Sequence, residues 1–143
     1  MPLGARLACD VGSVRIGIAR SDPHGILATP LDAVPAGERA IRAVADLVSE
    51  TEAVEVVVGL PLSLDGRRGA AAERAVSWAE ELGHAVAVPV VLVDERLTTV
   101  QAQRGLHAAG RTSKSSRAVI DSASAVVLLQ AHLDGLRGSE ASE

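Results

Sequence analysis

Three acidic residues occupy apolar surroundings at widely separated points of the chain. Asp10 and Glu95 each close an apolar run, and Asp121 lies inside the almost wholly apolar segment Ala118–Leu129. A carboxylate is costly to bury unless it is paired or binds a cation. If the fold brings the three acids together, divalent metal would relieve their repulsion, and metal-assisted hydrolysis of phosphodiester bonds is the chemistry that such a site performs.

The local patterns around these acids leave other interpretations open. Asp10 starts a glycine-spaced stretch that suits either backbone approach to a phosphate or an ordinary hairpin. Asp94 and Glu95 are consecutive strand residues, so only one of them can face a given site on a regular strand. Asp121 could instead gain from a helix dipole, or pair with Arg117 one turn earlier.

Basic side chains that could hold phosphate are nearly all arginines, with Lys114 as the exception. Arginine is well suited to bidentate phosphate contacts. The glycine-bearing loop that follows Gly59 resembles an anion-handling loop, but it lacks the Gly-Lys-Ser/Thr ending of a P-loop. The predicted nucleic-acid-binding residues are Arg15, Arg67, Arg68, Arg96, Lys114 and Arg117.

Composition limits the class of protein. The chain has 143 residues and a formal net charge of −4, which argues against a general nucleic-acid coat. Trp78 is the only aromatic residue, so no aromatic surface is available for base stacking. Cys9 is the only cysteine, and its place in an apolar strand predicts burial. Without a signal-like or membrane-spanning stretch, we expect a soluble cytoplasmic protein.

The positioning elements follow from hydrophobic periodicity and from Gly and Pro. Five strands are predicted: Arg6–Asp10, Arg15–Ser21, Ile26–Leu31, Ala53–Val58 and Ala87–Asp94. Four helices are predicted: Glu38–Glu50, Ala70–Leu82, Thr98–Ala109 and Ser115–Leu133. Pro30 suggests that the third strand lies at an edge. This order predicts a mixed sheet, parallel in its later part and covered by helices. We expect one domain over residues 1–137 and a disordered tail over 138–143.

Four motifs occur in a fixed order. They are Asp-x-Gly-x-x-x-Ile-Gly-x-Ala at Asp10–Ala19, Gly-Leu-Pro…Asp-Gly at Gly59–Gly66, Asp-Glu-Arg-Leu-Thr-Thr at Asp94–Thr99 and Ile-Asp-x-Ala-x-Ala…Leu-Leu-Gln at Ile120–Gln130. Together they resemble the YqgF (RuvX-type) family of small bacterial nucleases, with a match from Leu7 to Leu133. The order of four motifs makes this resemblance far more specific than any single motif.

The resemblance implies an α/β fold of ribonuclease H type, with a mixed five-stranded sheet flanked by helices. It implies that Asp10, Glu95 and Asp121 are the catalytic and metal-binding residues, and it selects Glu95 over Asp94. Oxygen ligands without histidine or cysteine favour Mg²⁺ or Mn²⁺. Two ions roughly 3.5–4 Å apart would then act in an in-line attack, with Asp10 as the bridging ligand.

The implied substrate is nucleic acid, and two substrates remain open. They are the 5′ end of the pre-16S rRNA and the Holliday junction. A junction resolvase would need a symmetric homodimer, whereas a processing nuclease could act as a monomer. A non-catalytic RNA-binding ribosome-assembly factor on the same scaffold is the alternative function. An actin-like ATPase is a weaker alternative, because it would need a second such domain, which 143 residues cannot supply.

Overall fold

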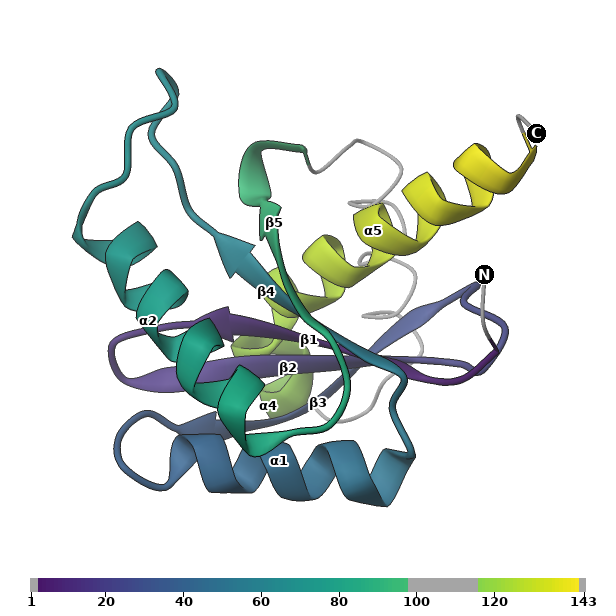
Figure 1. Cartoon of the computed structure of the whole chain (residues 1–143), viewed down its shortest axis with the longest axis horizontal. Coiled ribbons are helices and arrows are strands. Elements are labelled where there is room, and N and C mark those ends of the chain that lie inside the picture. Colours follow the sequence, from purple (N-terminus) through teal and green to yellow (C-terminus); the bar gives the residue numbers. More distant parts are fainter. Residues whose placement is uncertain (1–2, 98–115, 142–143) are drawn as a thin grey trace.

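The computed structural model describes residues 3–97 and 116–141. The predicted helix Thr98–Ala109 and the predicted phosphate contact Lys114 lie outside these residues. One central sheet separates two layers of helices, with α1 and α2 on one face and α4 and α5 on the other (Figure 1).

The sheet has five strands in the order β3-β2-β1-β4-β5. Their bounds are β1 Arg6–Val11, β2 Arg15–Ser21, β3 Ala28–Pro35, β4 Glu55–Leu60 and β5 Val90–Asp94. The first three strands pair antiparallel, whereas β1 pairs parallel with β4, and β4 pairs parallel with β5. The prediction of a mixed sheet with a parallel later part is confirmed, and the strand that contains Pro30 is an edge strand as expected.

The third strand begins later than predicted, at Ala28 rather than Ile26, and it ends later. The reason is the side chain of Asp22. Its carboxylate accepts hydrogen bonds from the backbone N–H groups of His24, Ile26 and Leu27, at 3.1, 2.8 and 2.8 Å. These bonds hold the segment in a turn, and they keep the pKa of Asp22 below its ordinary value.

The helices are α1 Ala40–Thr51, α2 Ala70–Ala85, α4 Ser116–Asp121 and α5 Ala123–Ala141, and a 3₁₀ turn η1 covers Glu95–Leu97. The predicted final helix is divided at Ser122 into α4 and α5, although the backbone hydrogen bonds of Ser122 continue the helical pattern, and the side chain of Ser122 bonds to the sheet. The predicted end at Leu133 is also too early. Arg137 anchors the extra turns by donating to the backbone carbonyls of Gly25 and Ile26, at 2.7 and 3.0 Å.

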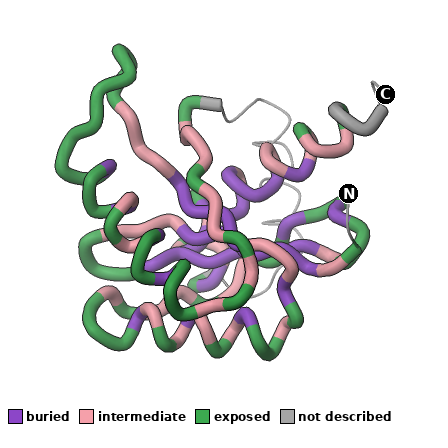
Figure 2. Tube along the Cα trace, in the orientation of Figure 1, coloured by how far each residue is buried: buried purple, intermediate pink, exposed green. Residues whose placement is uncertain are grey.

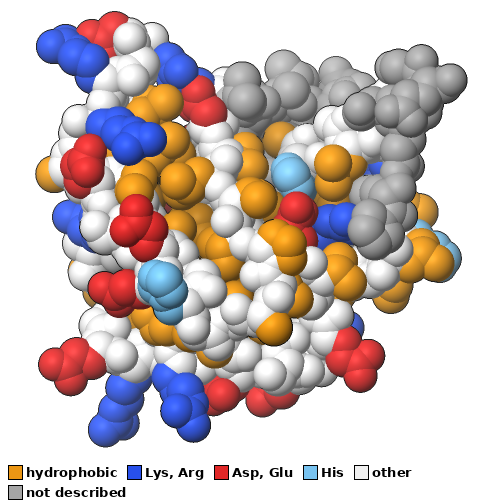
Figure 3. Space-filling model, in the orientation of Figure 1, with side chains coloured by type: hydrophobic (Ala, Val, Ile, Leu, Met, Phe, Trp, Pro, Cys, Tyr) orange, Lys and Arg blue, Asp and Glu red, His pale blue; other side chains and the backbone are white. Residues whose placement is uncertain are grey.

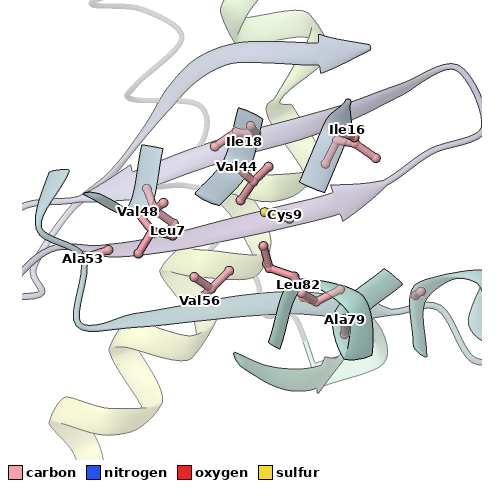
Figure 4. Packing of buried hydrophobic residues seen from close by; sticks show 13 residues of the cluster. Leu7, Cys9, Ile16, Ile18, Val44, Val48, Ala53, Val56, Ala79 and Leu82 are labelled. Atoms are coloured by element: carbon pink, nitrogen blue, oxygen red, sulfur yellow. The ribbon is translucent and has the colours of Figure 1, made fainter. Parts of the chain in front are cut away.

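Aliphatic side chains fill both faces of the sheet, and buried residues concentrate in its central strands (Figure 2). Leu7 and Cys9 of β1 point toward the layer of α1 and α2, where they pack with Val44 and Leu82 (Figure 4). Ala8 points to the opposite face and packs beneath α5. Cys9 is fully buried as expected, and burial raises the pKa of its thiol to about 12.

Among the helices of the described residues, none combines the length and the apolar character that crossing a lipid bilayer requires.

Candidate active site

The carboxyl ends of the three parallel strands β1, β4 and β5 lie side by side at one end of the sheet, and two of the predicted acids lie there. Asp10 is near the end of β1, and Glu95 follows directly after β5. Gly59 lies in β4, which pairs with β1 on one side and with β5 on the other. It follows Val58, the partner of Cys9, and it is itself the partner of Val93. The parallel pairing therefore explains why residues that are far apart in sequence approach each other at this end of the sheet.

The carboxyl groups of Asp10 and Glu95 are hydrogen-bonded to each other. A hydrogen bond between two carboxyl groups requires one of them to be protonated, and the raised pKa of Glu95 identifies Glu95 as the group that carries the proton. Partial burial raises the pKa of Glu95 to about 7, with further contributions from the charge and hydrogen bond of Asp10 and from the charge of Asp94. Glu95 therefore changes charge near neutral pH, which is unusual for a glutamate.

Gly59 makes room for this contact. A Cβ atom at Gly59 would lie 2.5 Å from Oε1 of Glu95 and 3.1 Å from Cδ2 of Leu128. Only a residue without a side chain lets the Glu95 carboxyl group lie over β4 and reach toward β1. The sequence analysis did not identify this role, although Gly59 was visible as the first residue of a motif that closes an apolar strand.

Asp121 ends α4 and lies over the neighbouring pair of strands. A Cβ atom at Gly17 would be 2.7 Å from the backbone oxygen of Asp121, and Gly17 is the cross-strand partner of Asp10. The side chain of Asp121 faces Arg15, with 3.4 Å between Oδ1 and Nη1. The ion pair with Arg117, considered above as an alternative, is therefore replaced by one with Arg15.

The three acids belong to one region but differ in their partners. The structure joins Asp10 to Glu95 and sets Asp121 beside Arg15 on the adjacent strand. Within residues 3–97 and 116–141, no three His, Cys, Asp or Glu side chains are close enough to hold a metal ion as they stand.

Asp94 has a different role from Glu95. Its carboxylate accepts hydrogen bonds from Nε and Nη2 of Arg96, at 3.0 and 2.7 Å, and these bonds lower the pKa of Asp94. Arg96 also donates to the backbone oxygens of Ser63 and Leu64, at 3.4 and 3.2 Å. Arg96 therefore holds the loop between β4 and α2 in place, and its charge is largely balanced by Asp94.

The other predicted phosphate contacts fall into two groups. Arg15 and Arg117 line a pocket of about 530 Å³ together with Asp121, and the end of β3 and Val14 supply the rest of the wall. Arg67 and Arg68 lie on the exposed loop between β4 and α2, where basic side chains gather at the upper left of Figure 3. Arg67 is ion-paired with Asp65 at 2.6 Å, but its side chain stays 85% exposed.

A mixed five-stranded sheet in the order β3-β2-β1-β4-β5, with helices on both faces, is a ribonuclease H-like fold. The fold is similar to that of Thermus thermophilus RuvC in complex with a Holliday junction substrate. That likeness has a TM-score of 0.67 at 14% identity, over 94% of this chain and 96% of that chain. The Fowlpox virus resolvase gives a TM-score of 0.57 at 10% identity, over 92% of this chain and 98% of that one.

The chain belongs to the RuvX family, since the family model described as "Holliday junction resolvase" matches residues 4–135. A protein of Mycobacterium ulcerans described as "Putative pre-16S rRNA nuclease" is 57% identical over 94% of this chain and 81% of its own length. A protein of Clavibacter michiganensis with the same description is 49% identical over 97% of this chain and 88% of its own length. The predicted family, ribonuclease H-like fold and nuclease class are confirmed.

Proposed function

We propose that this protein hydrolyses phosphodiester bonds in nucleic acid with the help of divalent metal ions bound by Asp10, Glu95 and Asp121. The observation that carries this proposal is the contact between the carboxyl groups of Asp10 and Glu95 at the edge of the parallel strands. Two acids pressed together in a half-buried place repel each other when ionised, and a cation between them would relieve that repulsion.

The donor set fits magnesium or manganese. All three side chains offer hard oxygen atoms, and histidine and cysteine take no part in the set. A bound metal ion would activate water and stabilise the charge on the leaving oxygen. Glu95 must lose its proton before it can act as a ligand, so its pKa, about 7, sets the pH range of binding.

The chain's own arginines would position the substrate. Arg15 and Arg117 lie in the pocket beside Asp121, where they can hold phosphates next to the cleaved bond. Arg67 and Arg68 lie on the exposed loop and would contact phosphates of the nucleic acid farther from the cleaved bond. Such contacts give affinity without reading bases, in agreement with the lack of aromatic side chains for stacking.

We propose pre-16S rRNA as the substrate, with cleavage at its 5′ end, because the similar mycobacterial and Clavibacter proteins are described as putative pre-16S rRNA nucleases. The description of the family makes a Holliday junction the second substrate to test. Cleavage of a four-way junction would imply a homodimer with two active sites, whereas rRNA processing is compatible with a monomer. The mass in solution should therefore be measured beside the cleavage assays.

The test compares wild type with Asp10→Asn and Asp46→Asn on both substrates with Mg²⁺ or Mn²⁺. Asp46 is the matched control, because it lies exposed on α1 and pairs only at the surface with Arg42. We expect cleavage by wild type and Asp46→Asn, a loss of at least about 100-fold in Asp10→Asn, and no cleavage after chelation of metal. RNA binding without cleavage by any of the three proteins would support the non-catalytic assembly factor instead.

A further inference from the structure

Ser122 is a fully buried polar residue between α4 and α5 that the proposed chemistry does not use. Its hydroxyl oxygen accepts a hydrogen bond from the backbone N–H of Ile18, at 2.9 Å. The same hydroxyl donates to the backbone oxygen of Leu31, at 2.7 Å. A side chain from the helical layer is thus bonded to two strands of the sheet at once.

The two strand residues are cross-strand partners. Ile18 of β2 lies opposite Leu31 of β3, and the pairing register shifts between Ile16 and Ile18. The hydroxyl of Ser122 therefore bridges an N–H and a C=O group at an irregular point of the ladder, where a bulge commonly redirects a side chain. This bridge fixes the junction of α4 and α5 on the sheet.

The backbone of Ser122 itself remains within the helical pattern. Its N–H donates to the oxygen of Ala118, and its own oxygen accepts from the N–H of Val126, both at 3.0 Å. The preceding residue is Asp121, whose backbone oxygen lies close to Gly17 of β2, the cross-strand partner of Asp10. A shift at Ser122 would therefore move Asp121 relative to Asp10 and Glu95.

We propose that Ser122 is a positioning residue, which fixes Asp121 against β2 beside Asp10 so that its carboxylate can join Asp10 and Glu95 in binding metal. This inference rests on the proposed function, because it assigns Ser122 a part in the same metal site. The rival interpretation is that the hydroxyl only stabilises the sheet, in which case its loss would affect folding and leave metal affinity unchanged.

Ser21 provides a matched control, because it lies on β2, the strand of Ile18 to which Ser122 bonds. It is also buried, accepts from the backbone N–H of Arg6 at 2.9 Å, and donates to the backbone oxygen of Asp22 at 3.0 Å. Its partner Arg6 is the first residue of β1, so this bond lies at the other end of the strand from Asp10. Four residues of β1 separate the two points, which corresponds to roughly 13 Å. Replacing either serine by alanine removes the hydroxyl oxygen that accepts a hydrogen bond from a buried backbone N–H group.

The experiment measures Mn²⁺ affinity by calorimetry, and thermal unfolding, for wild type, Ser122→Ala, Ser122→Cys, Ser21→Ala and Asp121→Asn. Both alanine variants should lose stability, but only Ser122→Ala should bind Mn²⁺ about 10- to 100-fold more weakly, the range for groups that orient metal ligands. The thiol is a weak donor and acceptor, so Ser122→Cys should lie between wild type and alanine. It also preserves the test if Ser122→Ala does not fold.

Two different failures can be told apart. If wild type binds Mn²⁺ more tightly than Asp121→Asn, but the Ser122 variants bind like Ser21→Ala, the positioning role is wrong and the metal site stands. If wild type and Asp121→Asn bind equally, or neither binds, the metal site itself is wrong and the role of Ser122 fails with it.

Discussion

Gly59→Ala is the substitution that tests the geometry of the site with the smallest chemical change. The added methyl group would lie 2.5 Å from Oε1 of Glu95, which is closer than real Cβ contacts come. The methyl group would also lie 3.1 Å from Cδ2 of Leu128, so the Leu128 side chain must shift slightly as well. The carboxyl group of Glu95 is the flexible end of its side chain, so it is the group that moves.

The expected effect is a moderate loss of stability together with a large loss of catalytic rate. Restoring ordinary van der Waals contact requires Glu95 to withdraw by about 1 Å, and mild overpacking of this kind costs about 1–3 kcal/mol. A catalytic group misplaced by about 1 Å can cost on the order of 100-fold in rate. We therefore expect a folded variant with a modestly lower Tm and about 1% of the wild-type rate at saturating metal.

Thermal unfolding and single-turnover cleavage measured on the same preparation would separate the two effects. Gly83→Ala is the control, because a Cβ atom at this position of α2 meets nothing within 4 Å. Alanine is the better helix former, so the control should be as stable as wild type or more so, with full activity. Undiminished cleavage by Gly59→Ala would refute the inference that Glu95 must lie over β4.

Three further predictions concern charge. Because the pKa of Glu95 is raised from 4.5 to about 7, the metal-free folded chain binds more protons than the unfolded chain between these values. Its free energy of unfolding, measured with denaturant, should therefore fall as pH rises from 5 to 7, while Mn²⁺ affinity increases over the same range. Arg15→Gln should weaken nucleic-acid binding and lower the slope of log K against log salt by about 1, whereas Arg42→Gln on α1 should not. Arg96→Ala should leave Tm nearly unchanged but speed proteolysis of the loop 61–69, because the bonds to Ser63 and Leu64 are lost.

The sheet could be predicted from sequence because its signals are local. Apolar runs bounded by glycine and proline marked the strands, and Pro30 marked an edge. The role of Ser122 could not be predicted in this way. Serine is tolerated within a helix, and nothing in the local sequence shows that its side chain bonds to strands that lie about 100 residues earlier in the chain.

The candidate site was predictable in its residues and less so in its contacts. Strand alternation showed that Asp94 and Glu95 could not both face the site. It could not show that Arg96 would bind Asp94, nor that the space above Gly59 would receive Glu95. Arg15 and Arg96 were equivalent as candidate phosphate contacts in the sequence. Only the fold sets Arg15 beside Asp121 and turns Arg96 toward its own loop.

The acids of the candidate site balance their charges in two ways, and an entering cation can replace both. Glu95 carries a proton in its contact with Asp10, and a pKa of about 7 allows Glu95 to release that proton at little cost. Asp121 faces Arg15, whose side chain is 55% exposed, and an ion pair open to solvent contributes little to stability and is easily exchanged. A cation that enters this region therefore competes with one weakly held proton and one weakly held guanidinium. Displacement of Arg15 from Asp121 would leave it in the pocket that it shares with Arg117, where it is available to a phosphate. On this reasoning metal and substrate should each strengthen the binding of the other, and Arg15→Gln should abolish most of that coupling.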